Sequence, residues 1–196
     1  QESIDKQKRR SVMRNKFLVF AAVGLGIALA SLPAEVQAGE YYARCNMRVV
    51  DKGNYVTWEN YRTDKGQRHI PVGTKLTGDG ETLTDPGGTT FKMKMGASGE
   101  QYLEKFVSKT PVEVDRAYAD DIKNGVPKVG MTKEQVYMAL CAPAYIDGKN
   151  ATKGMTYDEI MKSSFWIWKR MTFSTNIGVK FDSSGKAEEV AGVYGK

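Results

Sequence analysis

The stretch that decides the fold of this chain is Gly130-Met-Thr-Lys-Glu-Gln-Val-Tyr-Met-Ala-Leu-Cys-Ala-Pro143. Thr132 and Gln135 have the spacing of a capping box, in which each side chain satisfies a backbone group at the start of a helix. Pro143 disfavours helical backbone in the residue before it. The stretch therefore predicts a short helix that begins at Thr132 and reaches about Cys141.

Strand-like runs follow this helix at residues 165–173, 178–181 and 186–193, and Asp182-Ser-Ser-Gly185 forms a turn between the last two. Between helix and strands we expect a loop over 147–156 and a short helix to Lys162, because Thr156 and Glu159 form another capping box. Helices followed by an antiparallel meander predict an α+β fold, with a domain over residues 111–196 that also contains a helix near 113–124.

The preceding part, residues 40–110, has the pattern of a β-rich domain. Short strands are expected at 47–50, 55–61, 69–76, 81–84 and 89–95, separated by turn residues such as Asp85-Pro-Gly-Gly88. The capping-box spacing of Ser98 and Gln101 predicts a closing helix over 98–109. We expect a small bent β-sheet or an SH3-like barrel with this helix packed on it.

Residues 1–38 are interpreted as a leader with a secretory signal peptide whose start is Met13. Arg14 and Lys16 precede an apolar run, residues 17–32, and small residues near Ala38 suit cleavage. The product is expected to be periplasmic, with no transmembrane span after cleavage, and in one interpretation associated with the outer membrane. Because cleavage removes six basic and three acidic residues, the net charge falls from +6 to +3, which weakens any case for nucleic-acid binding.

The remaining chain contains two cysteines, Cys45 and Cys141. In an oxidising compartment they could form a disulfide, and two free thiols are the alternative. The sequence has one histidine, His69, and no cluster with the spacing of metal ligands. We therefore expect no catalytic residue, no metal and no cofactor.

The residues around the deciding stretch resemble the SmpA/OmlA domain of the BamE family of bacterial envelope proteins. The similarity covers about residues 115–193 and is carried by residues 130–136, by Leu140 with Pro143, by Trp166 and Trp168, and by residues 179–185. It implies helices packed on a three-stranded antiparallel sheet. The chain differs from the family pattern by Cys141 in a glycine position, by an insertion over 149–164 and by the lack of a lipid-attachment cysteine.

The run over 165–173 has two aromatic faces. Trp166, Trp168 and Arg170 share one face, and only one of the two faces can pack against helices. If the tryptophan face is exposed, its composition is typical of interaction hot spots. If it is buried, the tryptophans form the core, and the large area that tryptophan buries favours this arrangement.

These features predict a non-catalytic periplasmic protein that acts as a protein-interaction or scaffolding component, with another envelope protein as its partner. Trp166, Trp168 and Arg170 are the predicted contacts. The alternative is a module that binds the cell wall, that is peptidoglycan, through the first domain. A third possibility, a hydrolase, would depend on His69 and is disfavoured by the lack of a second histidine.

Overall fold

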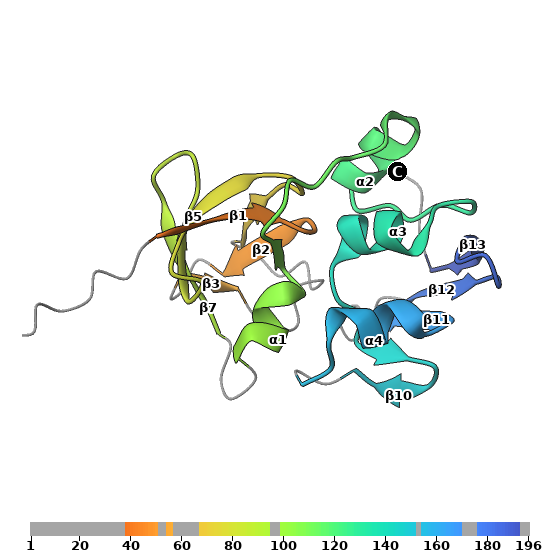
Figure 1. Cartoon of the computed structure of the whole chain (residues 1–196). Coiled ribbons are helices and arrows are strands. Elements are labelled where there is room, and N and C mark those ends of the chain that lie inside the picture. The colour runs from red at the N-terminus through yellow and green to blue at the C-terminus, as the bar shows by residue number, and fades with distance from the viewer. Residues whose placement is uncertain are drawn as a thin grey trace, which may run out of the picture. The chain divides into compact units, whose positions relative to one another are not determined.

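The computed structural model describes residues 38–50, 54–56, 67–94, 99–151, 154–169 and 176–192. Within these ranges the chain is an α+β protein with an eight-stranded mixed sheet, a five-stranded antiparallel sheet and four short α-helices (Figure 1). The predicted α+β class is thus confirmed. Among the helices described, none combines the length and the hydrophobicity that a bilayer crossing requires. The interpreted signal peptide lies outside the described residues.

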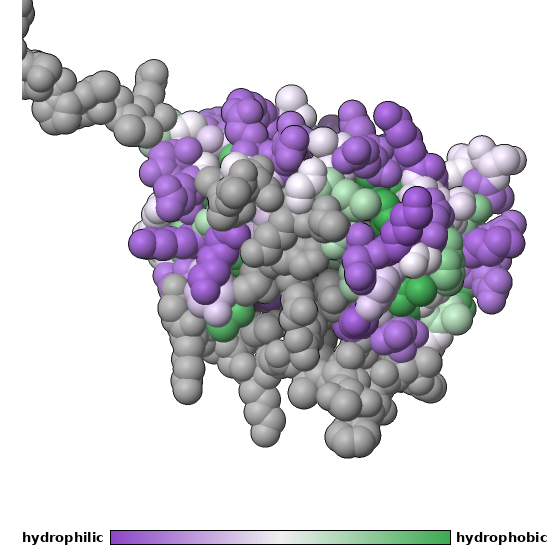
Figure 2. Space-filling model, turned by 90° about the horizontal axis from the view of Figure 1, so that it is seen from below, coloured by the Kyte–Doolittle hydropathy of each residue, from purple (hydrophilic) through white to green (hydrophobic). Residues whose placement is uncertain are grey.

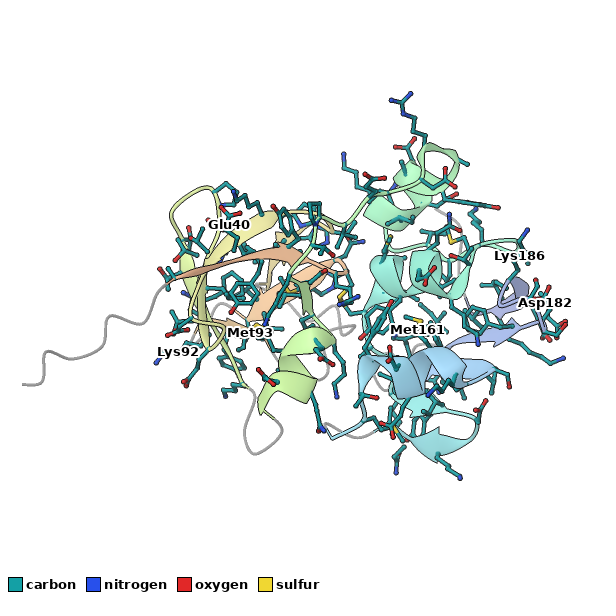
Figure 3. All side chains as sticks on the ribbon, in the orientation of Figure 1. Glu40, Lys92, Met93, Met161, Asp182 and Lys186 are labelled. Atoms are coloured by element: carbon teal, nitrogen blue, oxygen red, sulfur yellow. A yellow bond between two sulfur atoms is a disulfide. The ribbon has the colours of Figure 1, made fainter. Side chains whose placement is uncertain are left out.

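The first sheet has the strand order β4-β2-β3-β7-β6-β5-β1-β8. Its strands are β1 Gly39–Ala43, β2 Met47–Val50, β3 Tyr55–Val56, β4 Gln67–Ile70, β5 Lys75–Gly78, β6 Thr82–Thr84, β7 Thr90–Met93 and β8 Val107–Ser108. All neighbouring pairs are antiparallel except β3 with β7. Along β7 the exposed Lys92 alternates with the buried Met93, so one face of the strand packs inward (Figure 3).

The expectation of an SH3-like barrel is wrong, because β4 and β8 occupy opposite edges and do not pair with each other in the described part of the chain. The strand expected over 69–76 is also interrupted. Pro71 has no N–H to donate, and the chain turns after it, with Thr74 N–H donating to Pro71 O at 3.2 Å. The two parts of the predicted strand become β4, at one edge of the sheet, and β5, which lies next to β1 toward the other edge.

The second sheet has the order β10-β9-β11-β12-β13. Its strands are β9 Tyr145–Ile146, β10 Lys149–Asn150, β11 Phe165–Trp168, β12 Ile177–Phe181 and β13 Ala187–Ala191. Five strands replace the three expected, because the tight hairpin β9–β10 precedes and overlaps the loop predicted over 147–156. Asp147 and Gly148 both have positive φ, 45° and 78°, as the two-residue turn of such a hairpin requires.

The helices are α1 Gly99–Glu104, α2 Ala119–Lys123, α3 Lys133–Leu140 and α4 Tyr157–Lys162, and a 3₁₀ turn, Arg116–Tyr118, precedes α2. The capping boxes of Thr132 with Gln135 and of Thr156 with Glu159 are both present. Ser98 lies outside the described residues. The chain leaves the predicted helix 98–109 early, because Val107 and Ser108 pair with β1 instead.

Buried residues from both sheets and from the helices belong to one hydrophobic core cluster. The buried side chain of Asn46 connects the parts: its amide donates to Ile122 O and to Ala139 O, and its Oδ1 accepts from Val72 N–H. At the far end of the second sheet, Asp182 and Lys186 lie in the β12–β13 turn (Figure 3), where Asp182 Oδ1 accepts from Lys186 N–H at 3.0 Å. The division into domains at residues 110 and 111 stays a prediction.

Candidate binding groove

The two cysteines form a disulfide that joins the first sheet to the C-terminal end of α3. Cys45 follows β1 and Cys141 caps α3, 96 residues later in the sequence, and both are fully buried. Of the two states that the sequence left open, the structure has the disulfide. A disulfide of this kind indicates an oxidising, extracytoplasmic compartment.

Cys141 has a backbone conformation that favours glycine. Its φ is 59° and its ψ is −160°, a region that a non-glycine residue occupies only when its surroundings enforce it. Three contacts hold it there besides the disulfide: Cys141 N–H donates to Tyr137 O at 2.7 Å, Cys141 O accepts from Trp168 Nε1 at 3.1 Å, and Cys141 Sγ lies 3.3 Å from Asn46 O.

The predicted contact residues Trp166 and Trp168 lie in the core, with exposed fractions of 0% and 1%. Trp166 packs edge-on against Phe181 and Tyr137, and its Nε1 donates to Ser163 Oγ at 2.6 Å. The tryptophan face of β11 is therefore the packed face, and side chains buried in this way cannot contact a partner at the surface. The opposite face carries Phe165, which is 37% exposed. Arg170 lies outside the described residues.

An open groove lies where β1, β8 and α1 meet the beginning of α4. It consists of two adjacent depressions of about 970 and about 280 Å³, and Arg44 and Tyr157 line both of them. We call it the Arg44–Tyr157 groove. The larger depression is lined by Tyr41, Arg44, Asp79, Gly80, Gly99, Glu100, Leu103, Glu104, Val107, Lys109, Thr156, Tyr157 and Asp158. The smaller is lined by Arg44, Ser108, Thr110, Pro111, Val112, Glu113, Glu134, Met138 and Tyr157.

Arg44 and Tyr157 form a stacked pair at the junction of the two depressions. The guanidinium carbon of Arg44 lies 4.2 Å from the centre of the Tyr157 ring, and Arg44 Nε donates to Glu104 O at 2.7 Å. Tyr157 packs edge-on against Tyr137, with 5.1 Å between ring centres. Burial raises the pKa of Tyr157 although Arg44 opposes the shift, so the phenol stays neutral at neutral pH.

Beside the groove, the buried Lys105 ties the end of α1 to the segment before α4. Its Nζ donates to Met155 O, and its own backbone carbonyl accepts from Tyr137 Oη at 2.9 Å. Burial lowers the pKa of Lys105 to about 8, and the carboxylates of Glu159 and Glu104 oppose this shift. These bonds hold the two sides of the groove together.

Neither His69, which the sequence offered as a catalytic candidate, nor the acidic pairs of α2 and β13 line the groove. His69 is on the edge strand β4, where partial burial and the neighbouring Arg48 lower its pKa. Asp120 and Asp121 are in the first turn of α2, and Glu188 pairs with Lys180 at the surface of the second sheet. The described residues contain no group of histidine, cysteine or acidic side chains placed to hold a metal ion.

No motif in the sequence predicts the Arg44–Tyr157 groove. Arg44 and Tyr157 are far apart in the chain, and neither belongs to a motif. Two signals were available: Arg44 directly precedes Cys45, and Tyr157 directly follows the capping threonine Thr156. These neighbours indicate that Arg44 lies beside the disulfide and Tyr157 at the start of a helix. Only the folded chain brings Arg44 and Tyr157 into contact.

Comparisons of this chain with models of protein families, with curated proteins and with solved structures found no match.

Proposed function

We propose that this chain is a non-catalytic protein of the bacterial periplasm that binds another envelope protein and acts as an interaction or scaffolding component. The observation that carries the proposal is the Arg44–Tyr157 groove, which replaces the tryptophan face as the contact surface. It is open, and both apolar and charged side chains line it. A volume of about 970 Å³ is at the upper end of the range of ligand sites, ~300–1,000 Å³.

The compartment is supported by two independent features. The Cys45–Cys141 disulfide indicates an extracytoplasmic location, and the signal-like residues 13–38 would direct export. The resemblance to BamE-family proteins makes the periplasm the specific compartment proposed.

Support for the resemblance itself comes from the backbone. The helices α2 and α3 precede the antiparallel strands β11, β12 and β13, in the order that the family resemblance implies. Cys141 occupies the family's glycine position with a φ of 59°, which is the conformation that would select glycine there. Gly130 has a φ of 92°, and a Cβ at this position would lie 3.0 Å from Tyr118 Oη.

Peptidoglycan is the second candidate, favoured by Tyr41 and Tyr157, because aromatic rings in a groove can stack on sugars. The carboxylates that line the groove oppose it, since the peptide stems of peptidoglycan carry carboxylates of their own. Protein binding therefore stays the preferred proposal.

The test is crosslinking in the intact envelope followed by affinity capture of the full chain. The wild type is compared with Glu100→Arg/Asp158→Arg, which reverses charge at two exposed positions of the groove, and with Asp120→Arg/Glu189→Arg, the same change elsewhere. We expect one specific protein to be captured by the wild type and the control, and lost with the groove variant. Failure to capture any protein, together with sedimentation of the chain with purified cell walls, would favour peptidoglycan binding instead.

A further inference from the structure

We propose that the Arg44–Tyr157 groove binds a positively charged, extended segment of the partner protein, rich in lysine or arginine. The inference rests on the proposed function and specifies its partner. Three observations support it: the excess of carboxylates in the groove, the contacts that Arg44 already makes, and the apolar side chains that line the groove.

The groove has an excess of negative charge. In the part of the chain that the structure describes, its two depressions are lined by six carboxylate side chains, all exposed: Asp79, Glu100, Glu104, Glu113, Glu134 and Asp158. Among the described residues, ion pairs such as Lys75–Glu40 and Lys128–Asp121 involve none of these six, and Lys105 interacts electrostatically with Glu104. Carboxylates along a depression add their fields and attract a cationic partner more strongly than isolated surface charges do.

Among the described residues, two basic side chains line the groove, Arg44 and Lys109. Arg44 is already engaged by the ring of Tyr157 and by the carbonyl of Glu104, 2.7 Å from its Nε. Lys109 is exposed and lines the larger depression. Among these described side chains, the carboxylates therefore outnumber the basic groups by four.

The apolar residues of the groove suit long basic side chains. Tyr41, Leu103 and Tyr157 are partly exposed and line the same depression as four of the carboxylates. Lysine and arginine bury their aliphatic stems on such surfaces while the charged group reaches a carboxylate, and their cations also bind over aromatic rings. Among the residues that are coloured in Figure 2, hydrophilic side chains predominate, with hydrophobic areas between them.

The first test is direct binding of a defined probe to the full-length oxidised chain. A labelled peptide of alternating lysine and alanine is compared, by fluorescence anisotropy, with one of alternating glutamate and alanine. We expect the lysine peptide to bind and the glutamate peptide not to bind, with affinity that falls as salt is added. No binding of the lysine peptide, or binding of the glutamate peptide alone, overturns the inference.

Matched variants distinguish the groove from the net charge of the protein. Glu100→Gln/Glu104→Gln/Asp158→Asn removes three groove charges, and Glu81→Gln/Asp120→Asn/Glu189→Gln removes three exposed charges elsewhere. Both sets include a carboxylate in the first turn of a helix. We expect the groove variant to weaken lysine-peptide binding about tenfold and the control variant less than about twofold. Equal losses in the two variants overturn the inference.

The same groove variant separates this inference from the proposed function. If the envelope partner captured by the wild type is lost with the variant Glu100→Gln/Glu104→Gln/Asp158→Asn, both stand. If the partner is retained, the proposed function stands and the groove is not its site. If the wild type captures no protein at all, the proposed function fails, whatever the peptide measurements show.

Discussion

Trp166 is a predicted partner contact that lies in the core of the folded chain. Its side chain is fully buried, packs against Phe181 with 4.6 Å between ring centres, and donates from Nε1 to Ser163 Oγ. Ser163 is one of few buried polar residues in the described part of the chain, and this hydrogen bond satisfies both groups.

We therefore expect Trp166→Ala to lower the free energy of unfolding by about 3–5 kcal/mol, because it leaves a large cavity. Ile167→Ala, on the partly exposed neighbour that faces the other way, should cost about 1 kcal/mol. Equilibrium unfolding in urea measures both. Similar losses for the two variants would mean that the faces of β11 are buried alike.

Lys105 predicts a pH dependence. Its pKa in the folded chain is about 8, and in the unfolded chain it is near ~10.4. Below both values the ammonium is protonated in both states. Between them the unfolded chain keeps a proton that the folded chain has released, so raising the pH in this range stabilises the folded chain.

The measurement compares the wild type with Lys105→Met from about pH 7 to about pH 9.5, below the titration of tyrosines in the unfolded chain. We expect the free energy of unfolding of the wild type to rise by about 1 kcal/mol relative to the variant, after allowance for solvent screening of the ammonium. Lys109→Met, an exposed lysine of the same region, is the control and should follow the wild type. Parallel curves for the wild type and Lys105→Met would contradict the shifted pKa.

At the scale of elements, α3 and α4 show how local signals define helix starts. In each helix the capping threonine accepts from the backbone N–H three residues later, and the side chain of that residue accepts from the threonine N–H. In α3 these distances are 3.2 Å from Gln135 N to Thr132 Oγ1 and 2.8 Å from Thr132 N to Gln135 Oε1.

Loss of the N-cap of α3 should lower the stability of the protein modestly, and the loss should depend on the hydroxyl of Thr132. Thr132→Ala removes the acceptor at the start of α3 and should destabilise the protein by about 1 kcal/mol, whereas Thr132→Ser retains the hydroxyl and most of the stability. Thermal unfolding at one pH compares the two. If serine proved as costly as alanine, the methyl group of the threonine and not its hydroxyl would be the stabilising part.

At the scale of the whole molecule, the Cys45–Cys141 disulfide joins elements that the sequence separates by 96 residues. In the chain-entropy model, a closed loop of this length stabilises a folded chain by about 4–5 kcal/mol. The glycine-like backbone of Cys141 costs on the order of 1–3 kcal/mol. The bridge therefore stabilises this part of the fold by more than the strained backbone of Cys141 destabilises it.

This balance predicts a difference between two variants that both lack the bridge. Cys45→Ala/Cys141→Ala retains a Cβ at a φ of 59°, whereas Cys45→Ala/Cys141→Gly relieves it. We expect both to unfold at lower urea concentration than the oxidised wild type, and the glycine variant to be more stable than the alanine variant by about 1 kcal/mol. An alanine variant as stable as the glycine variant would show that the backbone relaxes once the bridge is absent.

The sequence by itself determined the features whose partners lie within a few residues. The capping boxes at Thr132 and Thr156, the turn at Asp182 and the α+β order of elements are all local, because each backbone group finds its partner close by in the chain. The turn residues Asp147-Gly148 also indicate a hairpin, although the prediction for residues 147–156 is a loop.

The tertiary structure alone decided which groups from distant segments meet. It buried the tryptophan face of β11, paired the cysteines and placed Arg44 over Tyr157. In a strand with two apolar faces, the large area of tryptophan favours burial of one face, but burial also depends on the elements that cover the strand. The groove has the same origin: its walls come from β1, α1 and α4, and it exists only after the core has placed these elements together.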